Sequence, residues 1–156
     1  MIPVNPVNCE IWSEIKGYEG LYYISSRGRV KKLVKDKEGN VKDKMMALAP
    51  SGATREYRAV SLTKDSVTKA YLVHRLVAES FIGLPGRWNP DGSVMRTDPE
   101  INHKDGCCSN NDVSNLEWCD RYYNNAHRRP SSEWNYTKRN YETGRKKHEK
   151  RNSEKT

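Results

Sequence analysis

The chain has 156 residues, which is enough for one ordinary domain or two very small ones. Its hydrophobic content of 35% and mean hydropathy of -0.99 are low for a single compact core, so we expect small modules with a large solvated surface. The net charge of +8, from 28 Lys and Arg against 20 Asp and Glu, favours a polyanionic partner, because each phosphate contact releases condensed counterions.

A membrane surface is polyanionic too, but the sequence argues against that partner. There is no apolar run of about 18 residues, which a membrane-spanning helix needs, and no signal-peptide core or basic amphipathic helix. Nucleic acid is therefore the favoured partner.

The cysteines predict the redox compartment. Cys107 and Cys108 are adjacent and no secretory leader is recognisable, so we expect reduced thiols in a cytoplasmic protein. A structural zinc on Cys107 or Cys108, Cys119 and a histidine is an alternative. The absence of a Cys-x-x-Cys pair favours thiols that pack as small hydrophobic groups.

Residues 9–50 predict a small antiparallel β module. Residues 21–24 are rich in aromatic and β-branched side chains, and residues 29–33 alternate like a half-buried strand after a turn at 25–28. The cations beside this turn could lie along a duplex groove; the alternative is a solvated edge strand whose charges prevent aggregation. These cations are Arg27, Arg29, Lys31 and Lys32.

The middle of the chain predicts a strand, a hairpin and a helix. After a charged connector over 35–44, residues 45–48 predict a short strand that ends before Pro50. Residues 57–62 and 69–73 alternate and predict a hairpin. Apolar positions 73, 76, 77 and 81 then have helical spacing, and Gly83 ends that helix.

The last third contains a long loop, a hairpin, a helix and a tail. Residues 84–100 are rich in proline and glycine and predict a surface loop. A strand hairpin over 101–119 precedes a helix over 120–129, with Asp120 as its N-cap and Pro130 after its end. The tail over 130–156 is basic with interleaved aromatics, and is expected to be loosely ordered or to bind a phosphate backbone.

The hairpin and its helix carry the polar residues that suggest chemistry. Ile101-Asn102-His103-Lys104-Asp105-Gly106 is followed by Asn110-Asn111, then by Asn115-Leu116-Glu117-Trp118, and then by Asn124. A ββα hairpin of this kind can hold one divalent cation and one general base around a single phosphodiester. We interpret it as a nuclease site.

These segments, with 73–81 and 124–127, resemble HNH homing endonucleases of phage or intron origin. Residues 12–22, with Ser25, Gly28, Arg29 and Val30, resemble the nuclease-associated modular motif that precedes such domains. The resemblance covers residues 10–128. It implies an α+β fold: N-terminal antiparallel β modules, a ββα-metal nuclease domain over 55–129 with its core at about 100–129, and the basic tail.

The resemblance also implies roles for individual residues. His103 is the general base, Asn102 and Asn124 bind one Mg²⁺ or Mn²⁺ ion, and Asn110 or Asn111 holds the loop so that the base keeps its orientation. The implied activity is hydrolysis of duplex DNA by a monomer, in one strand or both. Neutral imidazole is suited to accept a proton from water near neutral pH, and a hard cation on oxygen ligands offsets the charge on the phosphate.

Several residues keep more than one interpretation. Many relatives carry aspartate at the position of Asn102, and the neutral amide predicts weaker metal affinity without DNA. Asp105 is either a nearby charge or, as we favour, a turn residue. His127, three residues after Asn124, is a further candidate for the metal. His74 either packs or contacts phosphate, and the other expected phosphate contacts are Arg75, Arg128 and Arg129.

Two alternatives to an endonuclease remain. One is a non-catalytic DNA-binding protein on a decayed nuclease scaffold, which the neutral Asn102 favours. The other is a zinc-stapled structural module, which the cysteines favour. The presence of His103, Asn111, Asn115 and Asn124 in one register argues against decay, because an idle site has no physical need for that set. Asn115 is expected to close the loop through backbone hydrogen bonds.

Overall fold

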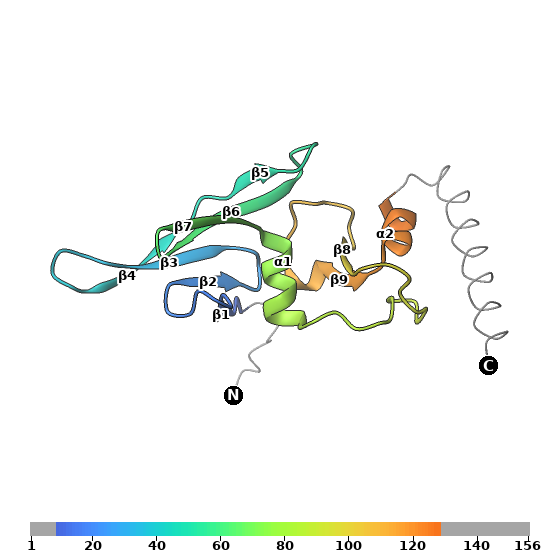
Figure 1. The fold of residues 1–156 in the computed structure, drawn as a ribbon, viewed down its shortest axis with the longest axis horizontal. Helices are drawn as coiled ribbons and strands as arrows, with labels where there is room; N and C mark the ends of the chain where they lie inside the picture. The colour runs from blue at the N-terminus through green and yellow to red at the C-terminus, as the bar shows by residue number, and fades with distance from the viewer. Residues whose placement is uncertain (1–8, 129–156) are drawn as a thin grey trace, which may run out of the picture. The chain divides into compact units, whose positions relative to one another are not determined.

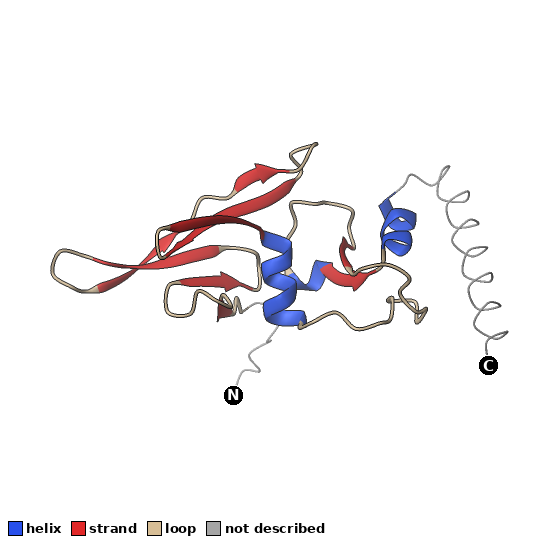
Figure 2. Cartoon of the chain, in the orientation of Figure 1, coloured by secondary structure: helices blue, strands red, loops and turns tan. Residues whose placement is uncertain are grey.

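The computed structural model describes residues 9–128 (Figures 1 and 2). The fold is α+β, as predicted, with antiparallel sheets and few helices. The elements are β1 (Trp12–Glu14), β2 (Tyr22–Ser25), β3 (Val30–Lys35), β4 (Val41–Met45), β5 (Ala49–Ser51), β6 (Tyr57–Lys64), β7 (Val67–Leu72), α1 (Val73–Val77), the π-helical turn η2 (Ala78–Ile82), β8 (Glu100–His103), the 3₁₀ turn η3 (Val113–Asn115), β9 (Leu116–Cys119) and α2 (Arg121–Arg128).

Contacts divide the chain into two compact units. Among the described residues, the first unit contains residues 9–84 and 107–116, and the second contains residues 85–106 and 117–128. The chain therefore passes between the units three times, and the loop after β8 belongs to the first unit. The sequence-based domain boundaries, 9–50 and 55–129, remain a prediction.

The first unit is built on two antiparallel sheets, ordered β1-β2-β3-β4 and β5-β6-β7. Tyr22 and Ile24 on β2 and Val30 on β3 are buried, as expected for alternating strands with one face in the core. The hydroxyl of Tyr22 accepts a hydrogen bond from the backbone N–H of Thr63 on β6, at 3.1 Å. This contact joins the two sheets within the unit.

The predictions for residues 35–48 were wrong. The expected connector contains β4, which pairs with β3 from Lys31↔Met45 to Lys35↔Val41. Every residue of β4 is exposed, so no alternation of buried side chains announces the strand. Residues 46–48 form no strand, and Pro50 lies inside β5, an edge strand where the missing N–H is tolerated.

The hairpin and helix predictions for the middle of the chain are confirmed. β6 and β7 pair from Ala59↔Leu72 to Lys64↔Val67. α1 follows directly and buries Val73, Leu76 and Val77, the apolar positions of the helical pattern. The α-helix then continues as the π-helical turn η2, where the N–H of Gly83 donates to the carbonyl of Ala78, five residues earlier, at 3.0 Å. Within residues 9–128, no helix is long and apolar enough to span a bilayer.

The turn between β2 and β3 supports the loop of the first unit that precedes β9. The N–H of Val113 donates to the carbonyl of Ser26 at 2.8 Å. Gly28 adopts φ +79°, and a Cβ atom on it would lie 2.6 Å from the Cβ of Asn111. Only glycine fits there, because both the backbone conformation and the close approach exclude a side chain.

Gly28→Ala is expected to destabilise the protein by about 2–4 kcal/mol, the sum of left-handed backbone strain and overpacking. Urea unfolding followed by circular dichroism would measure the loss. Gly39→Ala is the matched control: Gly39 also has positive φ, but a Cβ there meets no atom within 4 Å, so only the strain remains. Equal losses in the two variants would contradict the packing contact with Asn111.

Candidate active site

Most of the polar residues that the sequence singles out lie on β8, β9 and α2, among them Asn102, His103 and Asn124. β8 and β9 form a two-stranded sheet, and α2 packs against β8. Asn102 and His103 end β8 and are buried, with exposed fractions of 1% and 5%. The N–H of Gly106 donates to the carbonyl of His103 at 2.9 Å and closes the following turn. Asp105 lies exposed in that turn, which supports its interpretation as a turn residue.

The loop over Cys107–Leu116 is closed by its own amides. The side-chain Nδ2 of Asn115 donates to the backbone carbonyl of Asn110 at 2.9 Å, so its predicted role in closing the loop is confirmed. Asp112 caps η3 by accepting the N–H of Ser114 at 3.0 Å. Asn111 is buried in the first unit, which supports a role in holding the loop rather than in touching a substrate.

Both predicted ligands are held by glutamates through their amide nitrogens. The Nδ2 of Asn102 donates to Oε1 of Glu117 on β9 at 2.7 Å. The Nδ2 of Asn124 on α2 donates to Oε2 of Glu100 on β8 at 2.9 Å. Neither glutamate is predicted from the sequence, although Glu100 stands two residues before Asn102 and therefore shares its face of the strand.

The carboxamide of Asn102 fits a hard divalent cation. Its Oδ1 is buried and accepts no hydrogen bond. Buried oxygens of this kind are uncommon, because an unmade hydrogen bond costs about 1–3 kcal/mol. An amide oxygen is also a ligand type that Mg²⁺ and Mn²⁺ accept. His127 lies half-buried on α2, three residues beyond Asn124.

None of the four cysteines, all of which lie in the described residues, forms a disulfide. Cys9 and Cys107 are exposed, whereas Cys119 is fully buried. Burial raises the pKa of the Cys119 thiol to about 12, as expected for a thiol that packs as a small hydrophobic group. Within residues 9–128, no three His, Cys, Asp or Glu side chains are grouped so that they could hold a metal.

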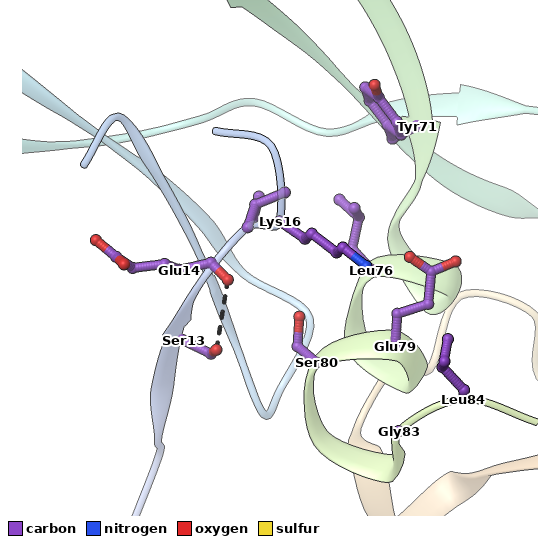
Figure 3. A pocket seen from close by; sticks show the side chains of 10 residues that line it. Ser13, Glu14, Lys16, Tyr71, Leu76, Glu79, Ser80, Gly83 and Leu84 are labelled. Atoms are coloured by element: carbon purple, nitrogen blue, oxygen red, sulfur yellow. Dashed lines mark hydrogen bonds between the residues drawn. The ribbon is translucent and has the colours of Figure 1, made fainter. Parts of the chain in front are cut away.

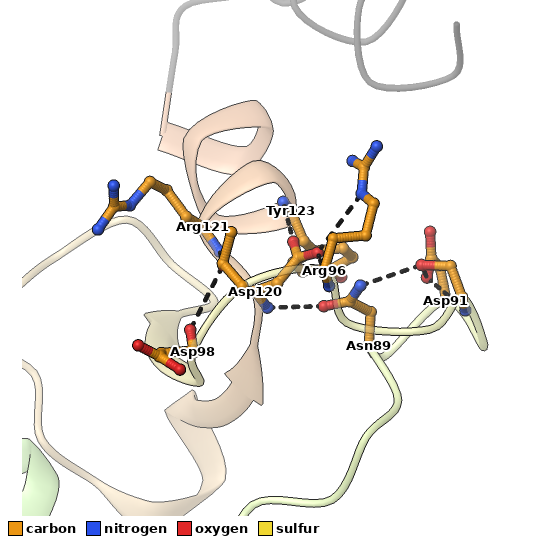
Figure 4. Close-up of polar contacts among 9 residues, drawn as sticks. Asn89, Asp91, Arg96, Asp98, Asp120, Arg121 and Tyr123 are labelled. Atoms are coloured by element: carbon orange, nitrogen blue, oxygen red, sulfur yellow. Dashed lines mark hydrogen bonds and ion pairs between the residues drawn. The ribbon is translucent and has the colours of Figure 1, made fainter. Parts of the chain in front are cut away.

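Asp120 lies at the start of α2 and makes polar contacts with Asn89, Arg96 and Tyr123 (Figure 4). Its Oδ1 accepts the N–H of Tyr123 at 2.8 Å, which confirms the predicted N-cap. Its Oδ2 accepts the backbone N–H of Arg96 at 3.1 Å, and its own N–H donates to Oδ1 of Asn89 at 2.7 Å. The irregular segment before β8 is thereby tied to the helix.

The predicted DNA-contacting cations of the first unit lie on or beside β3. This strand pairs with both β2 and β4, so the alternative of a solvated edge strand is wrong. Arg27 and Arg29 are exposed. The ammonium of Lys31 lies 4.7 Å from the ring centroid of Trp12 and 2.9 Å from Oδ2 of Asp43, and that of Lys32 lies 5.4 Å from the Tyr22 ring.

Arg29 is partly engaged by Glu10. Its Nε donates to Oε1 of Glu10 at 2.9 Å, and its second nitrogen pairs with the other carboxylate oxygen. This hydrogen-bonded pair lowers the pKa of Glu10 from 4.5 to about 2. The side chain of Arg29 nevertheless remains 58% exposed. A phosphate could therefore compete with the carboxylate for it.

Glu10→Gln is expected to destabilise the protein slightly at neutral pH and not at all in strong acid. Because the folded pKa is lowered, the stabilisation is present above the unfolded value of 4.5 and is lost as the pH falls through about 2. Melting temperatures of both proteins between pH 7 and pH 1.5 would measure the difference. A gap that persists at pH 1.5 would contradict the ion pair as its cause.

The remaining predicted contacts differ in accessibility. His74 is buried, and its ring centroid lies 5.1 Å from that of Tyr57, so it packs. Arg75 is exposed on α1. Arg128 is the last residue of α2, and Arg129 lies outside the described residues, as does the tail over 130–156.

The first unit also contains a pocket of about 430 Å³, shown in Figure 3. It lies between the β1 segment and α1 with η2, and Tyr71 and Leu84 complete its wall. Lys16, Glu14 and Glu79 are the charged side chains around it. None of the predicted catalytic, metal or DNA-contacting residues lines it, so it is separate from the candidate site.

Comparisons with known proteins point to the same family as the residues. Residues 10–76 match the model of the NUMOD4 motif. The chain is 33% identical over 116 residues to the uncharacterized HNH endonuclease L245 of Acanthamoeba polyphaga mimivirus, covering 74% of this chain and 29% of that protein. It is 33% identical over 107 residues to the DNA endonuclease I-HmuI of Bacillus phage SP01, covering 69% of this chain and 51% of that protein.

A solved structure is similar to this chain in fold and in sequence. It is described as DNA binding and cleavage by the HNH homing endonuclease I-HmuI, and it matches with a TM-score of 0.54 and 32% identity over 73% of this chain and 55% of its own. The chain thus spans about half or less of the length of these relatives. The chain therefore contains a NUMOD4 motif and, over about 70% of its length, is similar in sequence and fold to proteins named HNH endonucleases.

Proposed function

We propose that the protein is a metal-dependent endonuclease that hydrolyses a phosphodiester bond of duplex DNA. His103 is the general base, and Asn102 and Asn124 are the ligands of one Mg²⁺ or Mn²⁺ ion. The observation that carries this proposal is the buried Oδ1 of Asn102, which accepts no hydrogen bond and directly precedes His103 in β8. The relative I-HmuI, named as a DNA endonuclease, supports the reaction class.

The work of the chain itself is to position the base and to take up a proton. β8 ends at His103, and the turn closed by Gly106 fixes the backbone at this residue. An imidazole has an unperturbed pKa near 6.5, so its neutral form can accept a proton from water at neutral pH. The bound ion would offset the negative charge that the phosphate and the leaving 3′ oxygen gain.

DNA would be held by cations of the first unit. Arg27, Arg29 and Arg75 are exposed, and exposed cations contact phosphates without reading sequence. The net charge of +8 supports the same partner, because it favours association with a polyanion. Binding is therefore expected to weaken steeply as salt rises.

A plasmid assay tests the proposal. Supercoiled plasmid that contains the DNA flanking the gene is incubated with the protein and Mg²⁺ or Mn²⁺, and the ends are mapped. Open circles indicate nicking, linear molecules indicate cleavage of both strands, and EDTA should abolish both products. Binding without cleavage in either metal would overturn the proposal in favour of the second candidate, a non-catalytic DNA-binding protein, which the neutral Asn102 favours.

A further inference from the structure

We propose that Glu117 and Glu100 are positioning residues that orient the carboxamides of Asn102 and Asn124, so that the amide oxygens, and not the nitrogens, face the metal. This inference rests on the proposed function and extends it to two residues that touch neither substrate nor base. It arises from a feature that both asparagines share: the Nδ2 of each donates a hydrogen bond to a glutamate carboxylate, at 2.7 Å for Asn102 and 2.9 Å for Asn124.

The orientation follows from the hydrogen-bonding capacity of the partners. An ionised carboxylate only accepts hydrogen bonds, whereas a carboxamide presents two donor protons at one end and an acceptor oxygen at the other. Turning Asn102 over would place its oxygen against Oε1 of Glu117 and replace an attraction by a repulsion. The glutamate therefore selects one of the two orientations of the amide and directs Oδ1 away from itself.

The buried Oδ1 of Asn102 indicates what the orientation serves. The residue is 1% exposed, and the oxygen is left without a hydrogen bond although the nitrogen of the same group is bonded. A structural asparagine in a core would gain from satisfying both ends. A buried oxygen that is fixed in place and accepts no hydrogen bond from the protein is suited to coordinate a cation, since no hydrogen bond within the protein must be broken.

Both glutamates are themselves held in place. Oε1 of Glu100 accepts from Nε of Arg121 at 3.1 Å, which leaves Oε2 for Asn124. Glu117 also contacts the side chain of Tyr123 on α2. The phenol of Tyr123 donates a hydrogen bond to the carboxylate of Glu117. Each carboxylate therefore links the β hairpin to α2. Its contacts with α2 hold it in a fixed position, and from that position it orients its asparagine.

This arrangement also accounts for a neutral residue at position 102. An aspartate there would bring its carboxylate within hydrogen-bond distance of Glu117, and two like charges so close destabilise each other. The chain instead combines the neutral ligand Asn102 with the charged acceptor Glu117, so the negative charge lies on the neighbouring glutamate and not on the ligand itself. Surrounding groups that orient a ligand commonly change metal affinity by about 10–100-fold when they are removed.

The test measures Mn²⁺ affinity by electron paramagnetic resonance of the free ion. The protein is bound to duplex DNA in a His103→Ala background, so that no cleavage interferes. Glu117→Leu is expected to weaken Mn²⁺ binding by about tenfold or more. Glu117→Gln should stay within about threefold of the parent, because its carbonyl oxygen can still accept from Asn102. Glu38→Gln, an exposed glutamate far from the site in sequence, controls for the lost charge.

Two outcomes would overturn the proposal. One is unchanged Mn²⁺ affinity in a folded Glu117→Leu variant. The other is equal weakening by Gln and Leu, which would show that only the charge matters. If Glu117→Leu does not fold, the side-chain amide resonances of Asn102 in the metal-free parent and Glu117→Gln decide: slow proton exchange in both supports the anchored amide, and fast exchange in the parent refutes it.

The failure of this inference is distinguishable from failure of the proposed function. If the unmodified protein never cuts DNA but loses Mn²⁺ affinity in Glu117→Leu and keeps it in Glu117→Gln, the positioning role stands and hydrolysis does not. If the protein cuts DNA and Glu117→Leu binds Mn²⁺ as tightly as the parent, hydrolysis stands and the positioning role does not.

Discussion

His103→Ala is expected to lower the rate of duplex DNA cleavage by about 10²–10⁴-fold, the usual contribution of a general base. Alanine keeps the strand but cannot accept a proton, so water loses its acceptor while the proposed ligands remain. The rate of open-circle formation in Mg²⁺ or Mn²⁺ measures the effect. Affinity for duplex DNA, and its dependence on salt, should stay nearly unchanged because the proposed phosphate contacts come from other residues.

His148→Ala is the control for the loss of a histidine, since this residue lies in the tail, far from the hairpin in sequence. It should cut at the parental rate. A His103→Ala protein that is folded and cuts as fast as the parent would show that another group accepts the proton. A protein that loses DNA affinity as well would show that the substitution acts on the fold or on the interface, and not on the chemistry alone.

Asp120→Ala is expected to lower the free energy of unfolding by about 3 kcal/mol. The carboxylate is fully buried and accepts the N–H groups of Tyr123 and Arg96. Loss of an N-cap costs about 1 kcal/mol, and a buried N–H left without an acceptor costs a further 1–3 kcal/mol. Urea unfolding of the parent and variant, with tryptophan fluorescence as the probe, measures the difference.

Asp112→Ala is the matched control, because Asp112 also caps a helical turn but is less buried. Its loss should be about 1 kcal/mol. Asp120→Asn should fall between the two, since one amide oxygen can still accept an N–H. If Asp120→Ala costs no more than Asp112→Ala, the contacts to the segment before β8 contribute nothing, and the cap alone accounts for the residue.

The sequence predicts those elements whose side chains separate into a buried and an exposed face. The hairpin of β6 and β7 and the helix that starts at Val73 follow from alternation and from helical spacing, respectively. Asp120 as an N-cap follows from the fit of a short carboxylate to free N–H groups. The series around His103 was recognisable because its residue types stand in a fixed order.

The rest depends on contacts that have no local pattern. β4 is exposed throughout and is held by its ladder with β3 and by the pair of Lys31 with Asp43, so it shows no hydrophobic period. The partners of Asn102 and Asn124 are set by pairing across the hairpin and by packing of α2 on β8. The π-helical turn that ends at Gly83 likewise could not be predicted, because the spacing of the apolar residues fits an ordinary α-helix.

The three passages of the chain between the two units constrain how such proteins can be rearranged. Residues 107–116 pack with the N-terminal unit, where Gly28 and Ser26 support them, although they join β8 to β9. If residues 85–128 alone were fused to another protein, this loop would lose the contacts that support it. Recombination that exchanges the N-terminal unit must therefore keep the turn at 25–28 and the loop as a matched pair, even though some eighty residues separate them in sequence.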